Sequence, residues 1–188
     1  MKKLIFPLLL LCVTQIWAQS TGGFASVNFG TNRESVIEEI IKMGYDPMSQ
    51  SDGSGRVVIP VYMMGELPVQ VDFLFNKNDK FYAFEVRTGR LEAERLPKVF
   101  DALDYMSGQF ALKYGNKYKI TQIQEADIKP SVHNLYRQWF HKTLNVYTAI
   151  VFKDGRYYAI GSVTHRGLAK EPRLDGKSQR VRQTAPSF

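Results

Sequence analysis

Alternation between apolar and polar side chains constrains the fold of this chain more than any other feature. The clearest hairpin is formed by 144–152 and 157–163, which flank Asp154-Gly155. This residue pair tolerates the left-handed backbone of a tight hairpin turn. The same period of two recurs earlier in the chain, in 57–61, 69–75 and 82–86. We therefore expect a mainly antiparallel sheet.

Two other segments have the helical period. A helix over 32–44, capped by Thr31, is predicted from apolar residues spaced three and four apart. A second helix over 91–114 carries one apolar stripe, formed by Leu96, Val99, Phe100, Leu103, Met106 and Phe110.

Three further segments complete the expected order. We predict a first strand at 24–29 and another that begins at Tyr118, while 135–141 fits either a strand or a helix. The order is β-α-β-β-β-α-β-(β)-β-β, so a helix followed by an antiparallel meander occurs twice. The fold class is α+β: one mainly antiparallel sheet with two helices packed on one face.

The N-terminal segment has the layout of an export signal. Lys2 and Lys3 precede an apolar run over 4–13, and Ala18 ends a small-residue cleavage site before Gln19. The run is shorter than the roughly 20 residues that span a bilayer, and the residue before Cys12 is too large for a lipid-attachment signal. We expect removal of 1–18 and location in the periplasm or outside the cell, without a transmembrane segment. The Ala18-Gln19 junction resembles export signals of Bacteroidota.

Charge and cysteine content narrow the possible partners. Of the net charge of +7, four units lie in a polar segment over 166–188, where six basic residues face two acidic ones. We interpret this segment as a disordered basic tail, or a weak tether to an anionic surface, and the domain over 19–165 as nearly neutral. Such a distribution does not favour nucleic-acid binding. Cys12, the only cysteine, leaves with the signal, so neither a disulfide nor a thiol nucleophile is expected.

One short stretch supports a family resemblance. The residues Val27-Asn28-Phe29-Gly30-Thr31-Asn32-Arg33-Glu34-Ser35-Val36-Ile37 resemble the strand, Phe-Gly turn and helix start of small envelope modules. Two such modules are the β-lactamase inhibitory protein and the small lipoprotein of the outer-membrane barrel-assembly machinery. The resemblance implies a helix-plus-meander fold that binds other proteins. This chain lacks the disulfides of the first and the lipid-attachment signal of the second, and no binding residue carries over.

Reactive side chains do not form a recognisable site. The histidines His133, His141 and His165 lack metal-ligand spacing, and neither a nucleophile elbow nor a phosphate loop is present. We therefore expect no metal and no cofactor, and a binding function rather than an enzymatic one. An envelope hydrolase is the alternative, in which His133 and His141 would act with a carboxylate such as Asp127.

The strand registers predict apolar side chains on both faces of the sheet. If Phe75 faces Lys80, then Phe81 lies on the outer face with Tyr147, Tyr158 and Ile160. Trp139 could join this patch or belong to a cover over it. Three interpretations stay open: the segment 126–141 covers the patch, a protein or second copy binds it, or it lines a ligand pocket.

These observations favour an exported, non-enzymatic binding module. It would recognise a protein or a small ligand through Phe81, Tyr147, Tyr158, Ile160 and Trp139. A purely structural subunit of an envelope complex is a further alternative.

Overall fold

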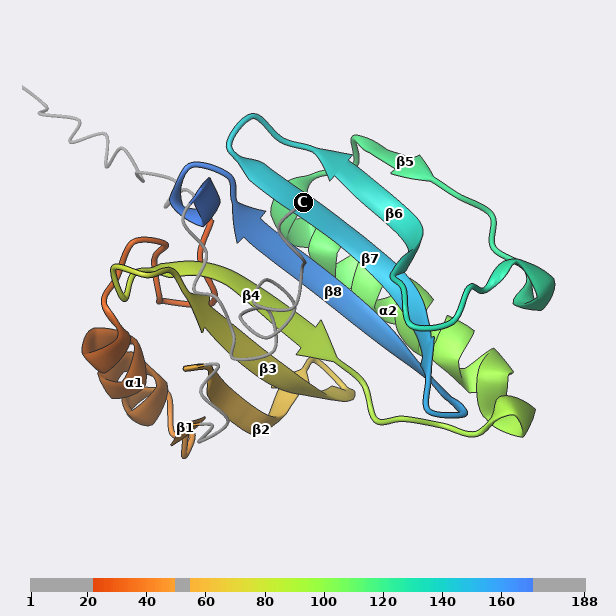
Figure 1. The fold of residues 1–188 in the computed structure, drawn as a ribbon, viewed down its shortest axis with the longest axis horizontal. Coiled ribbons are helices and arrows are strands. Elements are labelled where there is room, and N and C mark those ends of the chain that lie inside the picture. Colours follow the sequence, from red (N-terminus) through yellow and green to blue (C-terminus); the bar gives the residue numbers. More distant parts are fainter. Residues whose placement is uncertain (1–21, 50–54, 171–188) are drawn as a thin grey trace, which may run out of the picture.

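A single antiparallel sheet of eight strands forms the centre of the molecule (Figure 1). The computed structural model describes residues 22–49 and 55–170. The strands lie in the order β1-β2-β3-β4-β8-β7-β6-β5. Their bounds are β1 Met48–Ser49, β2 Val57–Met64, β3 Leu67–Phe75, β4 Phe81–Arg87, β5 Tyr118–Ile120, β6 Asn134–Phe140, β7 Leu144–Lys153 and β8 Arg156–His165. The predicted α+β class with a mainly antiparallel sheet is confirmed.

The sheet order is symmetric about the seam between β4 and β8. Each half contributes one helix, α1 (Arg33–Lys42) or α2 (Leu96–Tyr114), followed by four strands that run from one edge of the sheet to its centre. At the seam, Ala83 pairs with Thr164 and Glu85 with Ser162. The two helix-and-meander units predicted from the sequence are both present, and they pair with each other through their last strands, β4 and β8.

Helix α1 begins one residue later than predicted. Asn32 caps it, because the Asn32 side chain accepts a hydrogen bond from the Ser35 amide over 2.9 Å. Val36 and Ile40 are its buried residues and join the main core. The structure does not contain the strand predicted at 24–29. Phe24 and Val27 instead bond to each other across a tight turn, which places both side chains in the core.

Helix α2 follows a short 3-10 turn, Ala93–Arg95, and ends before Gly115. Its buried stripe packs against β7 and β8, behind which it lies in Figure 1. The predicted stripe is confirmed, with Phe100 at its half-buried border. A hydrogen bond of 2.7 Å between the hydroxyls of Ser107 and Thr148 also links α2 to β7. None of the helices in the described part of the chain is long and apolar enough to cross a membrane.

The main core lies between the sheet and the two helices. We call this side of the sheet the helix face and the opposite side the second face. The core combines residues of α1 and α2 with inward-facing residues of β2, β3, β4, β6, β7 and β8. The segment 135–141, which was ambiguous in the sequence, falls mostly within strand β6.

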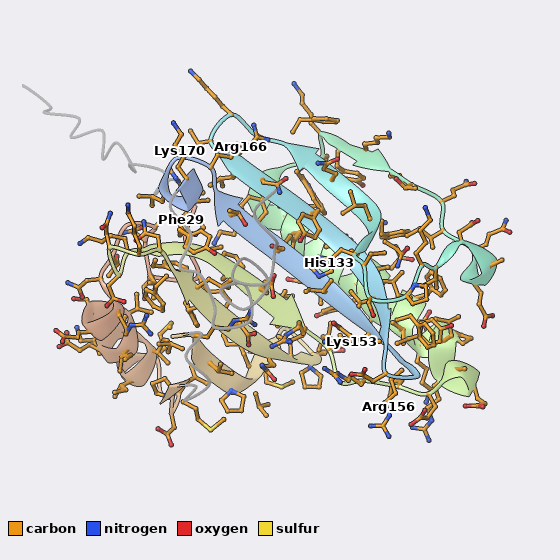
Figure 2. The ribbon with its side chains drawn as sticks, viewed as in Figure 1. Phe29, His133, Lys153, Arg156, Arg166 and Lys170 are labelled. Carbon is orange, nitrogen blue, oxygen red and sulfur yellow. The ribbon has the colours of Figure 1, made fainter. Side chains whose placement is uncertain are left out.

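Residues 166–170, assigned to the tail by composition, pack on the domain. The Arg166 amide donates to the Thr143 carbonyl, and the Leu168 carbonyl of the 3-10 turn Leu168–Lys170 accepts a hydrogen bond of 3.1 Å from Asn76. Arg166 and Lys170 lie at the same end of the sheet as Phe29 (Figure 2). The export signal over 1–18 and the rest of the tail, 171–188, fall outside the described residues.

Candidate functional site

A separate apolar cluster lies on the second face of the sheet. It consists of Ala149 and Val151 from β7 with Tyr158 and Ile160 from β8, and Tyr147 packs against it. Their alternate neighbours on the same strands, such as Ile150 and Ala159, belong to the main core. We call these five residues the second-face cluster. It exists because both central strands carry apolar residues at successive positions.

Three of the predicted binding residues meet in this cluster. Val151 pairs with Tyr158 and Ala149 with Ile160, as expected from the Asp154-Gly155 turn. Tyr147 is one step further along the same face, opposite Ser162. Asp154 and Gly155 have φ angles of 54° and 75°, so the turn has the left-handed backbone that its residues favour.

Phe81, however, does not lie on the second face. It was placed there on the assumption that Phe75 faces Lys80, but the irregularity between Leu74 and Phe75 pairs Phe75 with Phe81. Phe81 consequently turns to the helix face, where its ring lies 4.9 Å from that of Phe29, and it is fully buried in the main core. The bulge moves the side chain to the opposite side because the side-chain period of a strand is two.

Trp139 also lies in the main core. Its indole nitrogen donates to the Gly115 carbonyl over 2.8 Å, and its ring contacts those of Phe110 and Tyr118. These contacts fasten β6 to the end of α2. Trp139 therefore takes no direct part in the second-face cluster.

The segment 126–141 is not a layer over the second face. Its last seven residues are in or directly follow β6, which continues the sheet beside β7. One residue before the strand does reach the cluster: the imidazole Nδ1 of His133 lies 2.8 Å from the Tyr147 hydroxyl, and the two rings are 5.8 Å apart. His133 lies over β7 in Figure 2.

Beside the cluster lies a charged network that the sequence analysis did not identify. Asp72 of β3 is fully buried on the second face. It accepts hydrogen bonds from Arg87 and, over 2.6 Å, from Gln70, and Arg56 lies 3.5 Å from it. Asp72 lies on this face because its neighbours Val71 and Phe73 face the main core, and the two arginines converge on it through the pairing of β2, β3 and β4. A buried carboxylate needs such partners, because an unpaired charge is costly to bury.

The network and the cluster meet at the β4–β8 seam. Arg87 pairs with Ile160 across the seam, and the Arg90 guanidinium lies 5.6 Å from the centre of the Tyr158 ring. Burial raises the pKa values of the Tyr147 and Tyr158 phenols. Both hydroxyls therefore remain protonated at neutral pH and can donate hydrogen bonds.

A cavity of about 300 Å³ lies at the border of the network. Gln70 and Arg87 line it together with the bulged part of β2 and the end of β4. Its other lining residues are Pro60, Val61, Pro68, Val69, Thr88 and Gly89. The second face thus combines apolar, aromatic and cationic groups with a concave border.

The residues proposed for a hydrolase lie at separate places. His133 precedes β6 and His141 follows it, so roughly 20 Å of extended strand separates them. His141 bonds locally to Thr143, while Asp127 caps the 3-10 turn Glu125–Asp127 together with Gln124. Within the described residues no group of three histidine, cysteine or acidic side chains is placed to hold a metal ion.

Comparisons of the chain with protein-family models, with curated proteins and with solved structures gave no match. The functional inference is therefore argued from the geometry of the chain itself.

Proposed function

We propose that this chain is an exported, non-enzymatic binding module that recognises a protein or a small ligand through the second face of its sheet. One observation carries the proposal. Helices α1 and α2 pack on the helix face, while the opposite face bears its own apolar cluster beside a network of arginines. Export is supported by the pattern of 1–18.

The composition of this face suits recognition. Tyrosine and arginine are enriched in interfaces, since each buries a large area and retains polar groups that orient a partner. Here the Arg90 guanidinium lies over the Tyr158 ring, and Arg87 of β4 pairs with Ile160 of β8. Because Tyr147 and Tyr158 lie on paired strands, their backbone positions are fixed before any partner arrives.

Four of the five cluster residues are buried, with at most 7% of the surface exposed for Tyr158, while Tyr147 is half-buried. Long side chains contribute to this shielding: Arg90 lies over Tyr158, and His133 lies against Tyr147. Long charged side chains commonly cover apolar surface in this way. Rotamer changes at interfaces are frequent, so a partner would displace these side chains and take over their contacts.

Substitution of Tyr147 and Tyr158 by serine tests the proposal. The mature chain would be immobilised to capture a partner from an envelope extract, and the affinity of the identified partner would then be measured for each variant. We expect Tyr147→Ser and Tyr158→Ser each to weaken the affinity by about tenfold or more, as loss of a central aromatic contact does. Leu112→Ser is the matched control, because Leu112 is 83% exposed on α2 at the other side of the molecule.

Hydrogen exchange in the complex gives an independent check. We expect binding to slow exchange in β7 and β8 more than in α2, because the partner covers the second face. Full affinity in both tyrosine variants, or protection centred on α2, would overturn the proposal. So would global unfolding of the variants in thermal denaturation, because the tyrosines would then serve the core rather than recognition.

A further inference from the structure

A second concave site lies on the helix face, away from the second-face cluster. It is a cavity of about 240 Å³ between the last turns of α2, the turn at Phe24 and the strands β2 and β4. It is lined by Phe24, Ala25, Tyr62, Met64, Phe84, Gln109, Phe110, Lys113 and Tyr114. Its volume is just below the roughly 300 Å³ at which typical ligand pockets begin, so any ligand must be small.

The walls of this cavity are mainly aromatic and are fixed by contacts among themselves. The Phe24 ring packs edge-on against Tyr62 and Phe84, at centroid distances of 5.0 and 5.2 Å. Phe110 lies 5.7 Å from Tyr114 on the opposite wall. Rings held in this way preform an apolar site and lower the entropic cost of binding.

Among the described residues that line the cavity, Lys113 is the only one with a charged side chain. Its ammonium donates a hydrogen bond of 2.5 Å to the Gly23 carbonyl and lies 5.7 Å from the centre of the Tyr114 ring. Lys113 as a whole is exposed, yet desolvation by the surrounding protein lowers the pKa of its ammonium group. No carboxylate of the described residues forms an ion pair with it, so two of its three donors remain for a ligand.

The aromatic walls and the Lys113 ammonium limit which kinds of ligand the cavity can bind. A cation would be repelled by Lys113, and a polar molecule would leave its hydrogen-bonding groups unpaired against the aromatic walls. The carbonyl end of α2 disfavours an anion, but this effect is weaker than a direct hydrogen bond between a carboxylate and an ammonium group. A carboxylate can still pair directly with the ammonium.

We propose that this cavity binds a small apolar carboxylate, with the apolar part among the aromatic rings and the carboxylate on the Lys113 ammonium. The proposal is independent of recognition at the second face, because the two sites lie on opposite sides of the sheet and share no residue.

Titration of the isotope-labelled mature chain with sodium octanoate and with 1-octanol, followed by NMR, tests the site. We expect octanoate to shift the amide signals of Gln109 and Lys113 in a saturable manner, with an affinity about tenfold above that of octanol, since a charged hydrogen bond is roughly twice as strong as a neutral one. Lys113→Met should remove this difference, and Lys113→Arg should preserve it. Lys98→Met is the matched control, as Lys98 is an exposed lysine at the start of the same helix.

A cavity-filling variant separates the site from adventitious binding. Gln109 lines the cavity and is half-buried on α2, so Gln109→Trp should abolish the response to both probes while thermal unfolding stays cooperative. Equal affinity for the two probes, an unchanged affinity in Lys113→Met, or shifts that map to β7 and β8 would overturn the proposal. Of these results, only shifts in β7 and β8 would bear on binding at the second face.

Discussion

At the residue scale, the buried Asp72 carboxylate and the buried Tyr114 hydroxyl differ in whether their oxygen atoms have hydrogen-bond partners. Asp72 is fully buried, but Arg87, Gln70 and Arg56 surround it. The Tyr114 hydroxyl is buried and has no hydrogen-bond partner in the part of the chain that the structure describes. A buried hydroxyl without a partner lowers the free energy of unfolding by about 1–3 kcal/mol. Packing of the Tyr114 ring therefore leaves an unsatisfied oxygen that destabilises the fold.

Replacement of this hydroxyl is therefore expected to stabilise the fold. Tyr114→Phe keeps the ring and removes the unpaired oxygen, which should raise the free energy of unfolding by about 1 kcal/mol. Urea denaturation at pH 7 measures the change. Tyr136→Phe is the control that should lose stability, because the Tyr136 hydroxyl donates to Asp104 over 2.6 Å. A loss of stability in Tyr114→Phe would contradict the unpaired state of its hydroxyl.

The same variant should also alter the dependence of stability on alkaline pH. Burial raises the pKa of the Tyr114 phenol above its usual value of 10.0. Above pH 10 the unfolded chain loses this proton before the folded chain does, so the free energy of unfolding of the wild type falls as the pH rises. Tyr114→Phe should show a shallower decline in this range, measured by the same denaturation at pH 9 to 11.

At the element scale, the packing of α2 depends on the absence of a side chain on β8. A Cβ atom added to Gly161 would lie 2.5 Å from the Phe110 ring and 3.0 Å from Val86. Gly161 therefore allows the helix to approach the central strand. Gly108, on α2 itself, is exposed, and a Cβ atom there would meet no atom within 4 Å.

Alanine at the two glycines should consequently have opposite effects. Gly161→Ala is expected to destabilise the fold by about 1–3 kcal/mol through overpacking. Gly108→Ala should stabilise it by about 0.5–1 kcal/mol, because alanine favours the helix and restricts the unfolded chain. Thermal denaturation of both variants gives the signs. Equal effects at the two positions would show that the helix does not press on β8 as the structure has it.

At the scale of the whole molecule, the symmetric strand order determines which strands resist local unfolding. The strands β4 and β8 are paired on both sides and carry the seam between the halves. The edges are formed by β1 and β5, of two and three residues, and short edge strands limit unwanted pairing with other chains.

Native-state hydrogen exchange should reproduce this gradient. We expect the slowest amide exchange in β4, β7 and β8, close to the rate set by global unfolding, and exchange in β5 that is faster by at least about a hundredfold. Strands β7 and β8 are paired on both sides and pack against α2, and β4 is paired with both β3 and β8, whereas β5 is paired with β6 alone among the described residues. Uniform protection from β5 to β8 would show instead that the edge opens only together with the core.

Features that depend on neighbours along the chain were predictable from the order of the amino acids alone. The apolar stripe of α2 and the strands of the last hairpin follow from their periods, and the Asp154-Gly155 turn fixes the register that brings Tyr158 opposite Val151. These local preferences act before any distant segment is in place. The two helices and most strands were therefore predicted close to their observed bounds.

Features that depend on contacts between distant segments could be seen only in the folded molecule. The irregular pairing at Leu74 and Phe75 directs the Phe81 side chain into the main core. The hydrogen bond to the Gly115 carbonyl holds the Trp139 side chain on the helix face. The Asp72 network and the cavity at Lys113 arise because strands and helices far apart in sequence pack together. The side-chain period and the turn residues predict to which side of a strand each side chain points. They do not predict which residues from distant segments that side chain will contact.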